Sequence, residues 1–192
     1  MARRITVIDG HPDPRDGRLV HALADAYAKA AEQAGHEIKR LRVADMDLGF
    51  LRRPEEFDQG EPNDSVKHAQ AAIEWAEHLV ILYPLWMGTV PALLKAFFEQ
   101  VFRPRFALDY PSEGWPKGRL KGRSARIIIT MAMPALAYRF FYRAHSLKSL
   151  ERNILKLVGL GPFSDTLIGM VGKDQDQTKA VEKVAALGQA GR

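Results

Sequence analysis

The fold is decided by the stretch Leu79-Val-Ile-Leu-Tyr-Pro-Leu-Trp-Met-Gly-Thr-Val-Pro-Ala-Leu-Leu-Lys-Ala-Phe-Phe-Glu-Gln-Val-Phe102. Its first four residues, 79–82, form an uninterrupted aliphatic run, which is typical of a strand buried on both faces of a parallel sheet. Pro84 removes a backbone donor and ends that strand. Pro91 presets the backbone for the first turn of a helix, which we expect to continue to about Phe102.

The loop between this strand and this helix is the first candidate for a binding site. In open α/β sheets, ligands bind beyond the carboxyl ends of the strands. Trp86 and Met87 lie at that position, and Gly88 permits unusual backbone dihedrals beside them. The sequence therefore predicts a ledge on which an apolar ligand ring rests.

Short aliphatic strands alternate with amphipathic stretches along the rest of the chain, which predicts an α/β fold with a doubly wound parallel sheet. Besides the run at 79–82, strands are expected at residues 5–9, 37–43, 126–131 and 166–171. Helices are expected at residues 19–30, 66–76, 91–102, 138–158 and 176–187. Residues 37–43 alternate charged and apolar side chains, as an edge strand does. Residues 45–63 and 103–123 are rich in Pro and Gly, and we expect irregular surface segments there.

Composition limits the class of protein. The 192 residues are enough for one domain spanning residues 1–192 with a continuous core, and the chain has no cysteine, as is compatible with a reducing cytoplasm. The first apolar run is too short for a signal peptide or a membrane span. The net charge of +5 favours anionic partners. Because the basic residues are scattered and no nucleic-acid motif is present, we expect small anions and no nucleic acid.

The segment after the first strand is a candidate anion site. It reads Asp9-Gly-His-Pro-Asp-Pro-Arg-Asp-Gly-Arg18 and leads directly into a helix, whose first backbone N–H groups attract a phosphate. Arg15 and Arg18 add charged donors, and His11 adds another. No dinucleotide-binding glycine pattern or Walker lysine accompanies them. An ordinary turn with solvated arginines is the alternative interpretation.

At these residues the chain resembles a family, the flavodoxin-like NAD(P)H dehydrogenases (quinone), which includes quinone reductases and the ancillary oxidoreductases of potassium-efflux systems. The most specific resemblance is Tyr83-Pro-Leu-Trp-Met-Gly-Thr-Val-Pro-Ala-Leu-Leu-Lys95. The segment Gly10-His-Pro12 resembles the family's flavin-phosphate loop, and Leu120-Lys-Gly-Arg123, which leads to Thr130, is similar to a third landmark. Together the three places cover residues 4–161.

The resemblance implies a flavodoxin-like three-layer sandwich, in which a five-stranded parallel sheet of order 2-1-3-4-5 has helices on both faces. It also implies a bound flavin, FMN or FAD, and NADH or NADPH as co-substrate. The residues implied to contact the flavin are His11, Arg15, Arg18, Leu19, Pro84, Leu85, Trp86, Met87, Gly88, Thr130, Met131 and Ala132. After the fourth strand the family usually has two threonines and two glycines, whereas this chain has Thr130-Met-Ala-Met133 followed by Pro134. The departure concerns the wall that faces the nicotinamide or the substrate.

Two further residues are implied to take part in hydride transfer. Quinone reductases of this kind place a tyrosine and a histidine after the fourth strand, and Tyr138 and His145 stand near those positions, with Tyr142 and Arg143 as rivals to the histidine. A phenol and an imidazole suit the task because each can share a proton near neutral pH. The alternatives are a core aromatic for Tyr138 and a solvated helix residue for His145.

Other chemistries lack their residues. His21, His36, His68 and His78 have no metal-ligand spacing, so no metal site is expected. No Gly-x-Ser-x-Gly nucleophile elbow is present for a serine hydrolase.

The resemblance therefore predicts an enzyme that passes hydride from NAD(P)H through a flavin to a quinone-like acceptor. It implies a homodimer whose Phe50, Phe57 or Tyr110 approaches the flavin of the partner. A flavin-binding regulatory subunit, for example of a potassium-efflux transporter, is the alternative. A one-electron carrier is less attractive, because such carriers dock through an acidic surface and this chain is basic.

Overall fold

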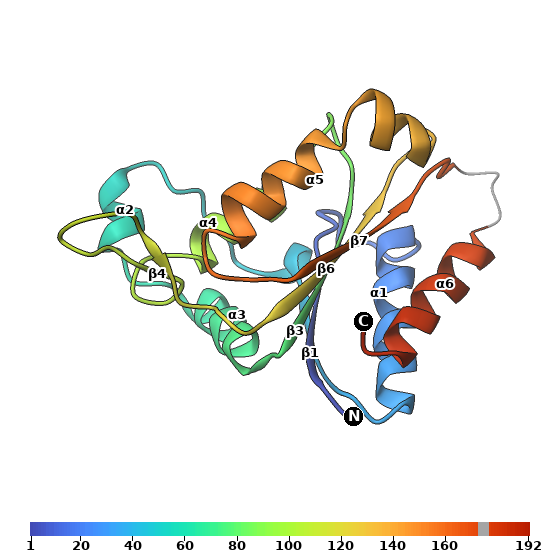
Figure 1. The fold of residues 1–192 in the computed structure, drawn as a ribbon, viewed down its shortest axis with the longest axis horizontal. Helices are drawn as coiled ribbons and strands as arrows, with labels where there is room; N and C mark the ends of the chain where they lie inside the picture. Colours follow the sequence, from blue (N-terminus) through green and yellow to red (C-terminus); the bar gives the residue numbers. More distant parts are fainter. Residues whose placement is uncertain (173–176) are drawn as a thin grey trace.

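The centre of the molecule is a parallel five-stranded sheet (Figure 1). The computed structural model describes residues 1–172 and 177–192. The sheet has the order β2-β1-β3-β6-β7 and consists of β1 (Arg4–Asp9), β2 (Glu37–Arg42), β3 (His78–Pro84), β6 (Ser124–Thr130) and β7 (Phe163–Ile168). Counted along the sheet strands alone, this is the predicted order 2-1-3-4-5.

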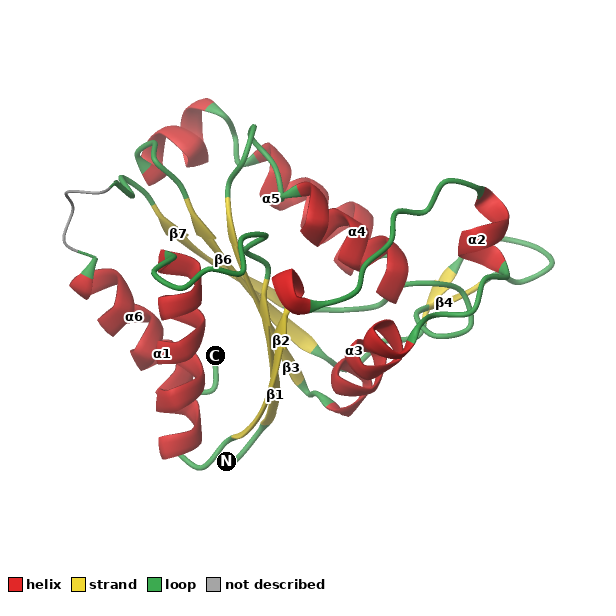
Figure 2. Ribbon diagram, turned by 180° about the vertical axis from the view of Figure 1, so that it is seen from behind, coloured by secondary structure: helices red, strands yellow, loops and turns green. Residues whose placement is uncertain are grey.

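Helices cover both faces of the sheet, which confirms the predicted three-layer arrangement (Figures 1 and 2). One face carries α1 (Leu19–Gln33) and α6 (Thr178–Gln189). The other face carries α3 (Asp64–Trp75), α4 (Ala92–Val101) and α5 (His145–Ser149). All seven residues of β3 are buried between the two layers, as the aliphatic run in its sequence predicts.

The two outer strands show why edge strands are harder to recognise. The predicted edge strand at 37–43 is confirmed as β2. The strand predicted at 166–171 is present as β7, but its predicted bounds are three residues too late, because β7 begins at Phe163 and ends at Ile168. Its first three residues include Ser164 and Asp165, which are only partly buried, so the strand starts before its aliphatic run does.

Both stretches expected to be irregular contain short regular elements. Residues 45–63 include the helix α2 (Pro54–Asp58), which follows a 3-10 turn at Val43–Asp45. Residues 103–123 include a small antiparallel pair, β4 (Leu108–Asp109) and β5 (Lys117–Gly118). These elements are too short to produce a periodic sequence pattern.

The single helix predicted at 138–158 is broken into three pieces. A π-helical turn covers Ala137–Phe141, α5 follows, and a second π-helical segment covers Leu150–Leu155. Between the first two pieces, Arg143 and Ala144 have φ angles of 54° and 49°. Two consecutive left-handed residues end a right-handed helix whatever the side-chain periodicity, which explains why the pattern failed.

Helix α6 is seated on α1 through a glycine. A Cβ added to Gly188 would lie 2.2 Å from the carbonyl oxygen of Tyr27, so only glycine allows this approach. The helix predicted at 176–187 begins with Asp176, which lies outside the described residues, and α6 extends to Gln189. Within the described ranges, no helix is long and apolar enough to cross a membrane.

Candidate functional site

The first candidate site, which we call the main cavity, has a volume of about 890 Å³ and lies at the carboxyl edge of the sheet. It lies beyond the ends of β1, β3 and β6 and between the starts of α1 and α6. The cavity is lined by His11, Gly17, Arg18, Leu19, Val20, Ala22, Pro84, Thr130, Val171, Gly172, Gln177, Thr178, Val181 and Glu182. Its volume is within the range of sites that hold drug-sized ligands and cofactors.

One end of the cavity is the start of α1, which is suited to an anion. The first backbone bond of the helix runs from the Ala22 N–H to the Arg18 carbonyl, so the preceding first-turn N–H groups lack helical partners. Among the described residues no side chain caps this end, and its first turn has no acidic residue. The partial positive charge of the helix start and the Arg18 guanidinium therefore act together at this end.

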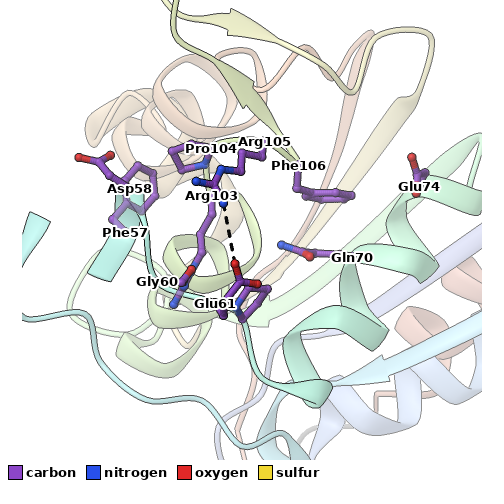
Figure 3. A pocket seen from close by; sticks show the side chains of 11 residues that line it. Phe57, Asp58, Gly60, Glu61, Gln70, Glu74, Arg103, Pro104, Arg105 and Phe106 are labelled. Carbon is purple, nitrogen blue, oxygen red and sulfur yellow. Dashed lines mark hydrogen bonds and ion pairs between the residues drawn. The ribbon is translucent and has the colours of Figure 1, made fainter. Parts of the chain in front are cut away.

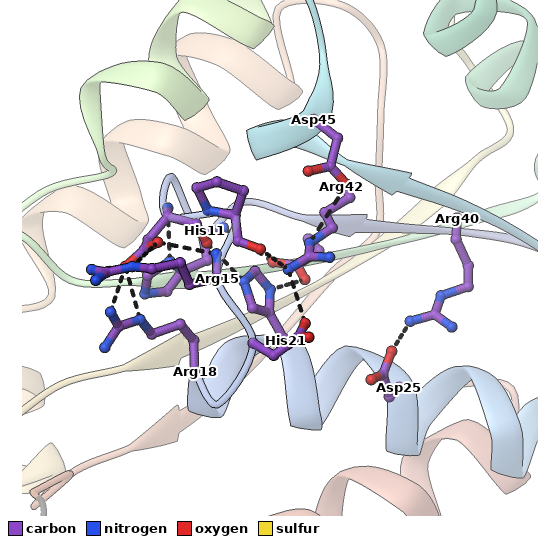
Figure 4. A network of polar contacts seen from close by, with 12 residues as sticks. His11, Arg15, Arg18, His21, Asp25, Arg40, Arg42 and Asp45 are labelled. Atoms are coloured by element: carbon purple, nitrogen blue, oxygen red, sulfur yellow. Dashed lines mark hydrogen bonds and ion pairs between the residues drawn. The ribbon is translucent and has the colours of Figure 1, made fainter.

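The loop before α1 holds its arginines in place with Asp13. Both Arg15 and Arg18 form ion pairs with the Oδ2 atom of Asp13, at 2.8 and 2.5 Å respectively (Figure 4). Hydrogen bonds from Arg15 are the largest cause that holds the pKa of Asp13 well below its usual range. Arg42, at the end of β2, donates to the Pro14 carbonyl at 2.6 Å and braces the loop from behind.

The other end of the cavity is formed by Pro84 and Thr130, next to the loop between β3 and α4. Pro84 and Thr130 are partners in the register of β3 and β6, and the Leu85 N–H continues the pairing by donating to the Thr130 carbonyl at 2.8 Å. Trp86 and Thr89 then exchange two backbone hydrogen bonds of 3.0 Å around a tight turn. The Trp86 ring meets the ring of His11 edge-on, with the centroids 5.9 Å apart. The loop predicted to carry a ligand ring thus contacts the predicted anion loop.

The structure brings many of the predicted contact residues together. His11, Arg18, Leu19, Pro84 and Thr130 all line the same cavity. Leu85 is partly buried beside them, and Trp86, Met87, Gly88 and Ala132 are exposed at the same edge of the sheet.

Seven of the twelve predicted contact residues do not line the cavity: Leu85, Trp86, Met87, Gly88, Ala132, Arg15 and Met131. Arg15 is exposed and does not line the cavity, because it turns toward Asp13. Met131 is buried, its N–H donates to the Ile168 carbonyl, and its own carbonyl accepts from Val171. Both backbone polar groups of Met131 thus form hydrogen bonds with the segment that contains the end of β7 and the residues after it.

The two residues predicted to assist hydride transfer are in different environments. Tyr138 is buried in the core, where its hydroxyl lies 2.7 Å from Ser146 Oγ and accepts from the Leu147 N–H at 3.1 Å. This placement is the core-aromatic alternative for Tyr138, and the phenol does not line the main cavity. His145 is exposed at the start of α5.

Sequence reasoning missed one wall of the cavity. This wall is formed by residues that follow β7 and by the first turns of α6, and it includes Val171, Val181 and Glu182. These residues are far in sequence from those that form the other walls, and they carry no motif. Only the position of α6 directly after the last strand indicates that they lie near the cavity.

A second cavity, of about 370 Å³, lies away from the sheet edge, between α2, α3 and the segment after α4 (Figure 3). Its central side chain is Arg103, which is buried and donates to the Gly60 carbonyl at 2.7 Å and to the Gln100 side chain. Arg103 therefore ties the segment that contains α2 to the end of α4.

Replacing Arg103 by methionine is expected to lower the free energy of unfolding by about 1–3 kcal/mol, because the hydrogen bonds from its guanidinium to the Gly60 carbonyl and to the Gln100 side chain are lost. Urea denaturation measures the change. Arg105→Met is the matched control, since Arg105 lines the same cavity but its side chain is 75% exposed. An equal loss of stability in the two variants would contradict the role assigned to Arg103.

Comparisons with known proteins agree with this architecture. An FMN-dependent NADH:quinone oxidoreductase of Nitratidesulfovibrio vulgaris is 26% identical over 204 residues, which cover 93% of this chain and 94% of the relative. FMN-dependent NADH:quinone oxidoreductase 1 of Colwellia psychrerythraea is 32% identical over 114 residues, which cover 57% of each chain. The match thus spans only about half the length of that relative. The NAD(P)H:quinone oxidoreductase from Methanothermobacter marburgensis has a TM-score of 0.84 with 18% identity over 100% of both chains, a likeness of fold.

A family model described as the flavodoxin-like fold matches residues 3–190, nearly the whole chain. The strand order, the cavity at the carboxyl edge of the sheet and this match together show that the chain belongs to the flavodoxin-like fold family.

Proposed function

We propose that the chain binds FMN in the main cavity and acts as an NAD(P)H:quinone oxidoreductase. The observation that carries the proposal is the cavity itself, which joins the uncapped start of α1 to the ends of β3 and β6, beside the apolar loop after β3. A flavin mononucleotide has the matching shape, with a phosphate at one end and a flat ring at the other. The names of the two curated relatives above support both the cofactor and the reaction.

The residues of the chain would divide the work between the two ends of the cavity. Arg18 and the first-turn N–H groups of α1 bind the phosphate, and the loop at 85–89 holds the edge of the ring. When bound, the flavin supplies the capacity to accept a hydride from NADH or NADPH and to deliver two electrons to a quinone. The protein contributes orientation and exclusion of water on the β3 side, where Pro84 and Tyr83 are buried.

The absorbance spectrum of freshly purified protein tests the cofactor, and mass measurement of the molecule released by heat identifies it. Steady-state oxidation of NADH and NADPH with a soluble quinone then tests the reaction. A colourless protein that also fails to bind added FMN would overturn the proposal. Bound flavin without turnover would instead favour the regulatory flavin-binding subunit.

Asp13 and Arg18 are expected to change phosphate binding in opposite directions. Arg18→Ala removes a charged donor and should weaken FMN binding by about 10- to 100-fold. Asp13→Asn removes a carboxylate that occupies the same guanidinium, at 2.5 Å, and should strengthen binding several-fold. Fluorescence titration measures both dissociation constants. Riboflavin, which lacks the phosphate, is the control ligand, and equal effects on riboflavin and FMN would contradict a phosphate contact.

We also propose that two copies of the chain form a homodimer in the cytoplasm. The support is a set of exposed apolar side chains after β6, which we call the aromatic patch: Leu136, Phe140, Phe141 and Tyr142, exposed by 71%, 73%, 80% and 48%. The rings of Phe141 and Tyr142 meet edge-on, with the centroids 5.0 Å apart. Exposed apolar surface commonly marks an interface. Tyr110 and Phe50 are also exposed, and a partner copy would bring them toward the flavin.

Replacing Phe141 by aspartate is expected to shift a dimer to a monomer, because the charge would be buried without a partner in the interface. Sedimentation velocity measures the mass, which should fall from twice 21.5 kDa to 21.5 kDa. The exposed Trp115, outside the aromatic patch, supplies the control variant Trp115→Asp. A monomeric unsubstituted protein at micromolar concentration would contradict the proposed dimer.

A further inference from the structure

A buried acid–histidine pair lies directly behind the anion loop. Asp9 ends β1 and His21 lies in the first turn of α1, and each is only 7% exposed. The Nδ1 atom of His21 lies 2.5 Å from Asp9 Oδ2, and its Nε2 atom lies 2.9 Å from the Asp13 carbonyl oxygen (Figure 4). The imidazole ring therefore bridges the two ends of segment 9–13.

The partners of His21 define how many protons the pair holds. A carboxylate oxygen and a carbonyl oxygen are both acceptors, and a neutral imidazole has only one N–H. Both contacts are hydrogen bonds only if an additional proton lies between Nδ1 and Asp9. The pair thus holds this proton between the imidazole and the carboxyl group, away from water.

The partners of His11 define which of its ring nitrogens carries the proton. The backbone N–H of Asp13 donates to Nδ1 of His11 at 3.1 Å, so that nitrogen accepts and the ring proton is on Nε2. The backbone N–H of His11 donates to the other oxygen of Asp9, at 3.1 Å. Burial and the neighbouring His21 lower the pKa of His11, and the two ring centroids are 5.2 Å apart. His11 is therefore neutral in this arrangement.

We propose that His21 is a positioning residue for cofactor binding. Together with Asp9 it holds segment 9–13 so that His11, which lines the main cavity, offers Nε2–H to the flavin phosphate or ribityl chain. Because Nδ1 of His11 accepts from the Asp13 N–H, the proton of the His11 ring is on Nε2 and serves as the donor. This inference rests on the proposed function for the identity of the ligand, whereas the protonation states belong to the protein alone.

The charged groups around the two histidines do not change this arrangement. Around His11 they are Asp9 from β1, Asp13 and Arg18 from the loop, and His21 from α1. Around His21 they are Asp9, Asp16, Asp25, Arg40 and Arg42. Asp25 and Arg40 pair with each other, and Asp16 lies 3.7 Å from Arg42. Asp9 is thus the carboxylate that is bonded to His21.

Nitrogen-15 NMR of the ring nitrogens, without flavin, tests the protonation states directly. At pH 7 we expect Nε2 of His21 to carry a proton that is donated to the Asp13 carbonyl, and His11 to carry one proton, on Nε2. An unprotonated Nε2 on His21, or a proton on Nδ1 of His11, would overturn the inference. This experiment needs no variant and no cofactor, so its outcome does not depend on whether the proposed function is correct.

The variant His21→Gln tests the positioning role. Because His21→Gln removes the neighbouring imidazole that lowers the pKa of His11, the NMR titration midpoint of His11 should move upward. FMN binding should weaken about tenfold, and between pH 5.5 and 7.5 it should depend on pH more steeply than in the unsubstituted protein, where the FMN phosphate itself titrates at about pH 6. His68→Gln, on the exposed face of α3, is the control and should behave as the unsubstituted protein.

The outcomes separate the two proposals. An unchanged His11 titration in folded His21→Gln would overturn the positioning role. If the unsubstituted protein shows the expected ring protons but binds no FMN, the proposed function fails and the assignment of the histidine pair stands. If His21→Gln does not fold, the ring nitrogens of the unsubstituted protein decide the question.

Discussion

Replacing Phe97 by alanine is expected to lower the free energy of unfolding by about 3–5 kcal/mol, the usual cost of deleting a fully buried aromatic ring. Phe97 lies on α4 and is completely buried against the sheet. Its ring also meets that of Phe98 edge-on, with the centroids 5.7 Å apart, so the deletion removes an aromatic contact together with buried area. The cavity that remains is closed on all sides and cannot fill with water favourably.

Urea denaturation, followed by circular dichroism, measures the effect of Phe97→Ala. Phe97→Leu keeps most of the volume and should cost roughly 1–2 kcal/mol. Phe50→Ala is the matched control because Phe50 is 62% exposed, and it should change stability by less than about 0.5 kcal/mol. Similar losses in Phe97→Ala and Phe50→Ala would show that α4 does not pack as the structure describes.

Acidification from pH 6.5 to pH 4 is expected to destabilise the protein by about 3 kcal/mol through His78 alone. His78 begins β3 and is 3% exposed. Burial is the largest cause that lowers its pKa from 6.5 to about 4, and the nearby Arg3 and Arg126 add to it. Its Nδ1 atom pairs with Ser124 Oγ at 2.8 Å.

The sign follows from where the proton binds. Below pH 6.5 the unfolded chain takes up a proton on His78 and the folded chain does not, so the proton favours unfolding. The contribution of His78 to stability is complete above pH 6.5 and is lost as the pH falls toward the folded pKa, with no further change below it.

Urea denaturation at several pH values between 4.5 and 7.5 measures this loss. Acidification also removes the stability that is contributed by carboxylates such as Glu56, whose pKa is lowered by hydrogen bonds from Arg52 and Arg53. The decisive quantity is therefore the difference between the unsubstituted protein and His78→Asn, which keeps a polar partner for Ser124 but cannot be protonated. His68→Asn controls for the substitution of a solvated histidine. Parallel pH profiles for the unsubstituted protein and His78→Asn would refute the prediction.

The sequence predicts the centre of this fold better than its margins, for a physical reason. A strand buried on both faces must be apolar throughout, and β3 is, so its pattern is unambiguous. The edge strand β7 needs only one buried face, and Asp165 within it even pairs with Arg139 outside the sheet. Likewise, the break at Arg143 and Ala144 depends on backbone angles that neither residue type signals.

The candidate site divides in the same way. The rule that parallel strands end at one edge predicts that His11, Pro84 and Thr130 meet, and they do. It does not predict the pair formed by Asp9 and His21, because that contact requires the rotation of α1 over β1. Nor does it predict that the hydroxyl of Tyr138 turns inward, which follows from the irregular helix around it.

The contact of Gly188 with α1 links the position of the last helix to the width of the main cavity. Gly188 is pressed against the backbone of Tyr27 at one end of α6, and Thr178 lines the main cavity at the other. Ten residues of helix separate them, about 15 Å at 1.5 Å per residue. A methyl group at Gly188 would push this end of α6 away from α1 and so displace the residues at its other end that line the main cavity. The width of that cavity is thereby set from a distance, by a residue that does not line it.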